Sequence, residues 1–118
     1  MAAYKPPLRD IFFLLDNIVD VGELCELEQF KHVDADTVKG IVEEFGRFAG
    51  DVIAPTDRDG DLEGATFDPD TKRVTVPESF TSAYRRYVDA DWAGVPFPSA
   101  YGGGQFPWLV GILLQEVL

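Results

Sequence analysis

The residues of this sequence that could do chemistry are few and widely separated. The chain holds one histidine, His32, and one cysteine, Cys25. A nucleophilic triad or a metal centre needs several such groups together, and neither residue has a partner at suitable spacing. Cys25 lies on an apolar face, where a thiol acts as core filler. We therefore predict no catalytic residue and no metal site, and we interpret His32 as a surface or boundary residue.

An acidic run, Asp57-Arg58-Asp59-Gly60-Asp61, has the composition of a calcium-binding loop. An EF-hand loop needs glycine at its sixth position and oxygen ligands that include the first and twelfth positions. With Gly60 as that glycine, these two positions are Pro55 and Thr66, and neither supplies a carboxylate. We therefore interpret the run as a solvated acidic loop.

The glycine run Gly102-Gly103-Gly104 invites comparison with a phosphate-binding loop. Such a loop follows a strand, opens a helix and carries a trailing lysine. Neither the strand nor the lysine is present here. From the residues alone, the run is a flexible or closely packed turn.

Composition excludes several classes of partner. The net charge of the chain is −11, so its surface repels phosphate backbones and anionic lipid headgroups. We therefore expect no nucleic-acid binding through a basic face. No apolar run approaches the roughly 20 residues that span a bilayer, so we expect no membrane span. The first ten residues lack an apolar signal core and a single cysteine suits a reducing compartment, so we expect a cytoplasmic protein.

Helices account for most of the expected elements. Pro6 and Pro7 oppose a helix, so residues 1–7 are expected to form an extended lead. Asp34 or Asp36 can cap a long helix that Pro55 stops. Its interior glycines either permit close packing of a neighbour or weaken the helix. Apolar residues at helical spacing predict the following helices: 8–19, 23–30, 38–53 and 78–90.

Two loops and one hairpin are expected between these helices. Residues 55–72 and 91–107 have no apolar period and are expected to be loops. Alternation in residues 73–76 predicts a short strand, which can pair with residues 65–67 across a turn. The predicted fold class is therefore mainly α, with at most a short β-hairpin near residues 65–76, in one domain that covers residues 8–118.

The last segment, residues 108–118, is apolar on nearly every face. A helix that is apolar all round is typical of the interior of a larger protein. We therefore expect that the chain is truncated inside this last helix, or that a partner covers it. The alternative is a C-terminal helix that is buried in the domain's own core.

Several short motifs follow one another along the chain in a distinctive order. They are YKPPLRD at 4–10, EFGRFA at 44–49, VIAP at 52–55, DGD at 59–61, DWAGV at 91–95 and YGG at 101–103. Together they resemble the N-terminal helical domain of the acyl-CoA dehydrogenase family, and most of all its larger branch with methylthiopropionyl-CoA dehydrogenase-like enzymes. Two positions depart from the family pattern: Ala100 stands in place of an acidic residue, and Gly104-Gln105 reverses the more usual order.

The resemblance implies an activity, a cofactor and partners for the parent protein. Family members bind FAD and oxidise an acyl-CoA thioester to its 2,3-unsaturated form. A carboxylate base removes the α proton while hydride leaves the β carbon for the flavin, and hydrogen bonds stabilise the enolate-like charge. The reduced flavin usually passes electrons to an electron-transfer flavoprotein. The resemblance therefore implies an FAD-dependent acyl-CoA dehydrogenase that forms homo-oligomers.

In the family, the base and most flavin contacts lie in a β domain and a C-terminal helical bundle. Both would follow Leu118, so this chain alone is expected to be inactive and not to bind FAD. The N-terminal domain packs on them and forms one wall of the acyl pocket. Tyr101, Gly102 and Gly103 would lie near substrate or flavin, although a tight turn is an equal alternative. Trp92 and Trp108 are expected in core or interdomain packing. The alternative function is a free-standing acidic helical module that binds a protein partner.

Overall fold

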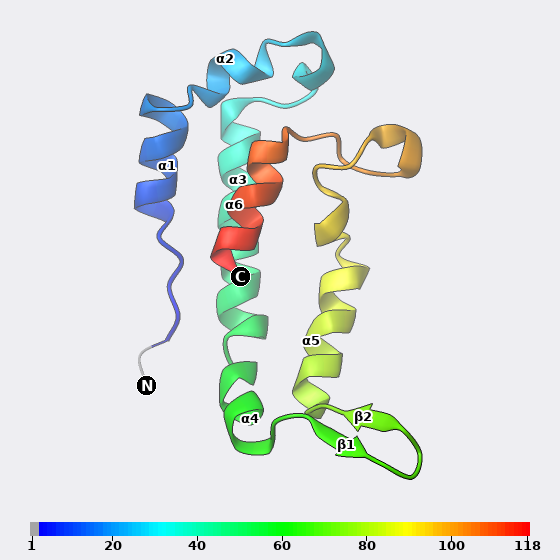
Figure 1. Cartoon of the computed structure of the whole chain (residues 1–118). Coiled ribbons are helices and arrows are strands. Elements are labelled where there is room, and N and C mark those ends of the chain that lie inside the picture. Colours follow the sequence, from blue (N-terminus) through cyan, green and yellow to red (C-terminus); the bar gives the residue numbers. More distant parts are fainter. Residues whose placement is uncertain (1–2) are drawn as a thin grey trace.

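The computed structural model of the chain describes residues 3–118 and measures 56 × 37 × 19 Å (Figure 1). The prediction of a mainly α fold with one short hairpin is confirmed. The described residues form α1 (Leu8–Asn17), α2 (Val21–Cys25), α3 (Ala35–Phe48), α4 (Thr56–Glu63), β1 (Thr66–Asp68), β2 (Arg73–Thr75), α5 (Glu78–Asp89) and α6 (Trp108–Val117).

Helix α3 is the centre of the fold. Val38, Val42 and Phe45 follow one another at spacings of four and three residues, so they share one face, and each is fully buried. The apolar faces of α1, α2 and α6 pack around this face to form one core. Of the two predicted caps, Asp34 and Asp36, it is Asp34 that caps the helix, and its carboxylate accepts a hydrogen bond of 2.7 Å from the backbone N–H of Thr37.

Helices α1 and α2 cover one side of α3. Ile11 and Leu15 face the core from α1, and Lys39 of α3 donates to Asp16 of α1 at 2.7 Å. The helix predicted over residues 23–30 forms as two pieces. Helix α2 ends at Cys25, and the 3-10 turn η1 (Glu28–Phe30) follows it.

The N-terminal lead crosses α3 where that helix carries glycines. In the described part of the lead, residues 3–7 are in neither helix nor strand, while residues 1 and 2 lie outside the described range. A Cβ atom on Gly46 would come 2.8 Å from the ring of Pro6, and one on Gly50 would meet the Tyr4 carbonyl at 3.5 Å. The Tyr4 hydroxyl donates to the Val117 carbonyl at 2.7 Å. Gly46 therefore permits close packing of the lead. A Cβ on Gly50 would make only an ordinary contact, and nothing approaches the site of a Cβ on Gly40.

The predicted loop over residues 55–72 is wrong in its first half, because residues 56–63 form a helix. Helix α3 widens into the π-helical turn η2 (Ala49–Ile53), and the chain then re-enters a helix, α4, beyond Pro55. The Ala54 N–H donates to the Ala49 carbonyl, five residues back, at 2.8 Å. Pro55 then stands at the N-cap of α4, where the missing N–H of proline removes no hydrogen bond from that helix. Gly60 of α4 lies against the Phe80 ring of α5, which a Cβ would approach at 2.7 Å. Close packing, rather than an apolar stripe, therefore holds α4.

The hairpin and α5 match the prediction closely. Strands β1 and β2 pair antiparallel, with Phe67 opposite Val74. The turn between them is held by Asp68, whose carboxylate accepts hydrogen bonds from the Thr71 hydroxyl and from the backbone N–H of Asp70. These bonds, the Thr71 hydroxyl first, lower the pKa of Asp68.

We expected protein outside the chain to enclose the whole last segment, and for one face of α6 this expectation was wrong. Val110 and Val117 are fully buried within this fold, and Leu113 and Leu114 nearly so. The opposite face remains open, because Trp108 and Ile112 are 60% and 61% exposed. The two predicted alternatives therefore each hold for one face of α6. One face is buried in the domain's own core, and the other face is uncovered.

The cap of α3 gives the fold a pH-dependent contribution. Hydrogen bonds from Thr37, the backbone N–H first, lower the pKa of Asp34 in the folded state. A carboxyl with a depressed pKa stabilises the fold above its unfolded pKa of about 3.9 and loses that effect as the pH falls through the folded pKa. We expect Asp34→Asn, which keeps a capping oxygen, to lose less stability than the wild type between pH 7 and pH 3. Urea midpoints at the two pH values measure this, and equal losses would contradict it.

Candidate functional site

The segment that carries the predicted Tyr101-Gly102-Gly103 site is a closed loop. It begins with the 3-10 turn η3 (Trp92–Gly94), passes through a second turn η4 (Ser99–Tyr101) and ends at α6. Its two arms bond to each other, because the N–H of Gly104 donates to Gly94 at 3.0 Å and that of Phe106 donates to Val95 at 3.1 Å. The segment predicted as a loop is therefore held by its own backbone and projects at the upper right of Figure 1.

Each glycine of the run meets a different constraint. Gly102 has a φ of +83°, in the left-handed region that favours glycine. A Cβ on Gly103 would overlap the backbone carbonyl of Phe97, and one on Gly104 would lie 2.9 Å from the Val95 carbonyl. The run is therefore a closely packed turn.

Two polar side chains tie this loop to the region around η1. The Gln105 amide donates to the Gln29 carbonyl at 3.1 Å, and its side-chain oxygen accepts from the Ser99 hydroxyl at 2.8 Å. His32 Nε2 lies 3.0 Å from the Gly104 carbonyl, and its ring meets that of Phe106 edge-on. Sequence reasoning placed His32 at a boundary but missed this role, since no spacing links residues that lie 72 positions apart.

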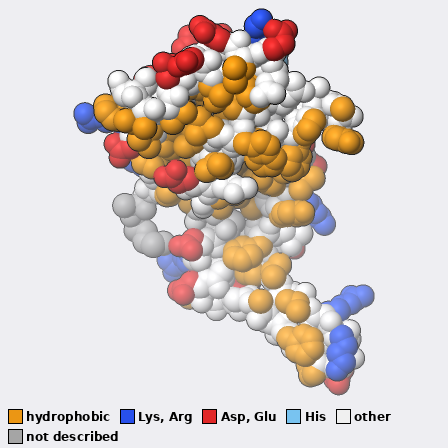
Figure 2. Space-filling model, turned by 45° about the horizontal axis from the view of Figure 1, so that its top comes forward, with side chains coloured by type: hydrophobic (Ala, Val, Ile, Leu, Met, Phe, Trp, Pro, Cys, Tyr) orange, Lys and Arg blue, Asp and Glu red, His pale blue; other side chains and the backbone are white. Residues whose placement is uncertain are grey.

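The loop presents aromatic side chains outward. Tyr101 is 88% exposed, and the rings of Phe97 and Trp108 meet edge-on at 5.8 Å. Ile112 is also exposed, and we call these four exposed side chains together the outer face (Phe97, Tyr101, Trp108 and Ile112). Figure 2 shows apolar side chains gathered across one face of the molecule, with acidic side chains mainly toward its edges.

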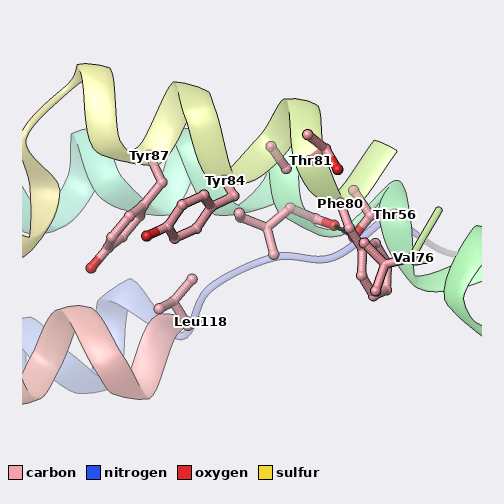
Figure 3. Close-up of a pocket in the computed structure, with 9 residues that line it drawn as sticks. Thr56, Val76, Phe80, Thr81, Tyr84, Tyr87 and Leu118 are labelled. Atoms are coloured by element: carbon pink, nitrogen blue, oxygen red, sulfur yellow. Dashed lines mark hydrogen bonds between the residues drawn. The ribbon is translucent and has the colours of Figure 1, made fainter. Parts of the chain in front are cut away.

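The second candidate feature is an apolar groove of about 650 Å³ beside the end of α6 (Figure 3). Its floor comes from η2 and the start of α4, one wall comes from α5, and Leu118 lies at one end. We call this feature the α5 groove. Its lining residues are Ile53, Thr56, Val76, Phe80, Thr81, Ala83, Tyr84, Tyr87 and Leu118.

The α5 groove is suited to apolar contacts rather than to acid–base chemistry. Its lining contains no carboxylate, histidine or basic side chain. The Thr56 hydroxyl already donates to the Ile53 carbonyl at 2.7 Å. The groove can therefore bury apolar side chains or an alkyl chain, but it has no group that could hold the pyrophosphate of a dinucleotide.

The other residues considered from the sequence do not gather into a site. Cys25 is buried in the core, and desolvation, followed by the charge of Asp34, raises the pKa of its thiol. Asp57, Asp59 and Asp61 lie on α4. Within residues 3–118, no group of three His, Cys, Asp or Glu side chains is arranged to hold a metal ion. None of the helices described is long and apolar enough to cross a bilayer.

Trp92 and Trp108 have different surroundings. Trp92 packs against Phe45 with ring centroids 4.9 Å apart and lies 5.9 Å from Phe48, so the prediction of core packing is confirmed for this residue. Trp108 belongs to the outer face, and a role in interdomain packing stays a prediction.

A mainly α domain with this element order and one hairpin is the architecture expected of the N-terminal helical domain of acyl-CoA dehydrogenases. The chain is 34% identical over 115 residues to 3-methylmercaptopropionyl-CoA dehydrogenase of Ruegeria pomeroyi. It is 32% identical over 116 residues to the broad-specificity linear acyl-CoA dehydrogenase FadE5 of Mycobacterium tuberculosis. Each match covers 98% of the chain and 19% of the relative.

These matches confirm the resemblance to acyl-CoA dehydrogenases, which extends over nearly the whole chain. The chain spans about a fifth of the length of these curated relatives. No protein-family profile matches it.

Two glycine substitutions, one in the loop and one on α3, test whether the loop is closely packed. Gly103→Ala would place a methyl group on the Phe97 carbonyl, and we expect it to lower the free energy of unfolding by about 1–3 kcal/mol, as overpacking does. The matched control is Gly40→Ala, which has open space and should raise stability by up to about 1 kcal/mol through helix propensity. Urea unfolding measures both. Equal effects of the two substitutions would contradict the proposed packing.

Proposed function

We propose that this chain is the N-terminal part of an FAD-dependent acyl-CoA dehydrogenase, an oxidoreductase that introduces a 2,3 double bond into an acyl-CoA thioester. In this proposal the chain forms one wall of the acyl pocket and packs on the remainder of the enzyme. An electron-transfer flavoprotein accepts the electrons, and the enzyme is a homo-oligomer.

The observation that carries the proposal is the pair of matches to dehydrogenases along 98% of the chain. If the chain were an independent acidic module that binds a protein partner, nothing would explain why its sequence is similar to two dehydrogenases over its whole length. The matches therefore favour the dehydrogenase over the alternative of a free-standing module.

The shape of the chain supports a role as one layer of a larger protein. A compact protein of this size has an accessible surface of about 6,400 Å² and a radius of gyration of about 13.5 Å. This chain has a surface of 8143 Å² and a radius of gyration of 17.2 Å. The excess surface, roughly 1,700 Å² by the same scaling, is about twice the roughly 800 Å² that each partner buries in a standard protein interface.

The lining of the α5 groove does not suit the cofactor. When it is bound, FAD accepts the hydride that leaves the substrate. Its pyrophosphate is bound by basic side chains or backbone N–H groups. The α5 groove, the largest cavity described above, is lined by apolar, threonine and tyrosine side chains. We therefore assign the main flavin site and the catalytic base to the remainder of the enzyme.

The contribution of this chain is a rigid apolar wall. Tyr101 projects from a loop whose backbone is closed by hydrogen bonds. Gly102 provides a left-handed turn in that loop, and Gly103 brings the backbone close to the Phe97 carbonyl. We assign these three residues to the substrate or flavin side of the wall. In this position, the outer face would exclude water from the acyl chain and orient the thioester toward the base.

The protein of full length tests the proposed function. We expect it to purify with bound flavin and to reduce an artificial electron acceptor when an acyl-CoA is added, whereas residues 1–118 alone remain colourless. A folded protein of full length without flavin, and without acyl-CoA-dependent reduction of the acceptor, would contradict the proposal.

Tyr101→Ala tests the assignment of the loop. The side chain is 88% exposed in this chain, so its removal should leave the stability of residues 1–118 within about 0.5 kcal/mol. In the enzyme of full length, we expect kcat/KM for an acyl-CoA to fall about tenfold or more. The matched control is Phe67→Ala, which removes a ring that is 58% exposed on the hairpin. Equal kcat/KM values for the two variants would contradict the assignment.

A further inference from the structure

Gln105, in the closed loop before α6, has a backbone conformation that favours glycine. Its φ is +53°, in the left-handed region where a Cβ atom lies too close to the following carbonyl oxygen. The order Gly104-Gln105, which reverses the order more usual in the family, places a side chain at this position. A residue in such a conformation persists only where the surrounding structure holds it, and such residues cluster at sites that clamp ligands. The interactions of Gln105 must therefore offset this strain.

The side chain of Gln105 uses both ends of its amide. The side-chain oxygen accepts hydrogen bonds from the hydroxyl of Ser99 at 2.8 Å and from the backbone N–H of Ser99 at 3.3 Å. The side-chain nitrogen donates to the Gln29 carbonyl at 3.1 Å. A backbone N–H can only donate and a carbonyl can only accept, so these partners determine which way the amide points. The Gln105 side chain is therefore a clamp between two turns, η4 through Ser99 and η1 through Gln29.

The clamp acts on the turn that carries Tyr101. Ser99 is the first residue of η4 and Tyr101 is the last. Two backbone hydrogen bonds of 3.0 Å close the turn, from Tyr101 to the Pro98 carbonyl and from Gly102 to the Ser99 carbonyl. The Tyr101 side chain is exposed, so contacts within this chain do little to fix its direction. Its position therefore depends on the turn, which Gln105 holds to the body of the fold.

A second contact holds the same loop at a different place. His32 Nε2 lies 3.0 Å from the carbonyl of Gly104, on the arm of the loop that returns to α6. The backbone N–H of Gly104 also donates to the Gly94 carbonyl on the other arm. Loss of the Gln105 clamp would therefore leave the two arms attached and would release mainly η4.

We propose that Gln105 is a positioning residue, which holds η4 so that Tyr101 keeps the direction needed to contact the acyl-CoA substrate. This inference rests on the proposed function, in which Tyr101 lies on the substrate or flavin side of the wall. Gln105 acts through Tyr101 and is not itself a catalytic residue. Glycine at this position would relieve the backbone strain but would leave η4 without its clamp. The sequence therefore favours a fixed turn over an unstrained backbone.

Gln105→Gly and Gln105→Ala separate this role from a merely structural one. Both remove the clamp, but only glycine relieves the left-handed strain. In residues 1–118, we expect a higher urea midpoint for Gln105→Gly than for Gln105→Ala. In the protein of full length, we expect both to lower kcat/KM for an acyl-CoA about fivefold, mainly through KM. The matched control is Glu28→Ala, which removes an exposed side chain of η1 outside the clamp and should change kcat/KM less than about twofold.

Combination with Tyr101→Ala tests whether Gln105 acts through Tyr101. If it does, Gln105→Gly lowers kcat/KM about fivefold when Tyr101 is present but less than about twofold in the Tyr101→Ala variant. An equal loss in both backgrounds would overturn the inference, as would a wild-type kcat/KM for Gln105→Gly. A urea midpoint that is lower for Gln105→Gly than for Gln105→Ala would contradict the backbone strain from which the inference starts.

The wild-type protein of full length separates a failure of this inference from a failure of the proposed function. Bound flavin and acyl-CoA oxidation in the wild type, with Gln105→Gly equal to it, would reject the role of Gln105 and retain the function. Absence of flavin and of activity in the folded wild type would reject the proposed function and, with it, the positioning of a substrate through Gln105.

Discussion

The packing of α6 against the buried face of α3 organises the molecule. Phe45 is fully buried where the two helices meet and also contacts Trp92, with ring centroids 4.9 Å apart. Val110 and Val117 are fully buried from the α6 side. Burial of a side chain of this size contributes about 1.5–3 kcal/mol, so several together fix the position of α6. The lead, the closed loop and the α5 groove all take their positions from this contact.

This packing also explains why the fold has uncovered apolar surface. The molecule is 19 Å thick, which is about the width of two helices. A layer of that thickness can bury one face of each helix but not both. The outer face of α6 and the exposed side of α5 therefore stay open, as they would in a domain that packs on others. The surface excess over a compact protein agrees with this account.

The sequence predicted the elements that carry their own periodic signal. Helices α1, α3 and α5 have apolar stripes, and the cap of α3 was narrowed from its position to Asp34 or Asp36. Helix α4 was missed because its packing depends on Gly60, a residue without a side chain, against Phe80. Burial of α6 in the domain's own core was given only as the alternative, because an apolar residue in a sequence does not reveal whether the residues that cover it lie within the chain.

The candidate site was predictable only in part. The glycine run was interpreted as a flexible or closely packed turn, and the structure shows the closely packed one. The bonds of His32 and Gln105 across the fold join residues far apart in the sequence. Such contacts depend on tertiary packing, which no local pattern encodes. The assignment of Tyr101, Gly102 and Gly103 to the substrate or flavin side came from family resemblance and stays a prediction.

Amide hydrogen exchange on residues 1–118 tests the central packing most directly, because exchange rates report local opening free energies. The packing of α6 on α3 predicts that the amides of Leu113, Leu114 and Val117 exchange about as slowly as those of Val42 and Phe45. Exchange in α6 as fast as in the exposed hairpin would show that α6 does not pack on α3, and would contradict this account.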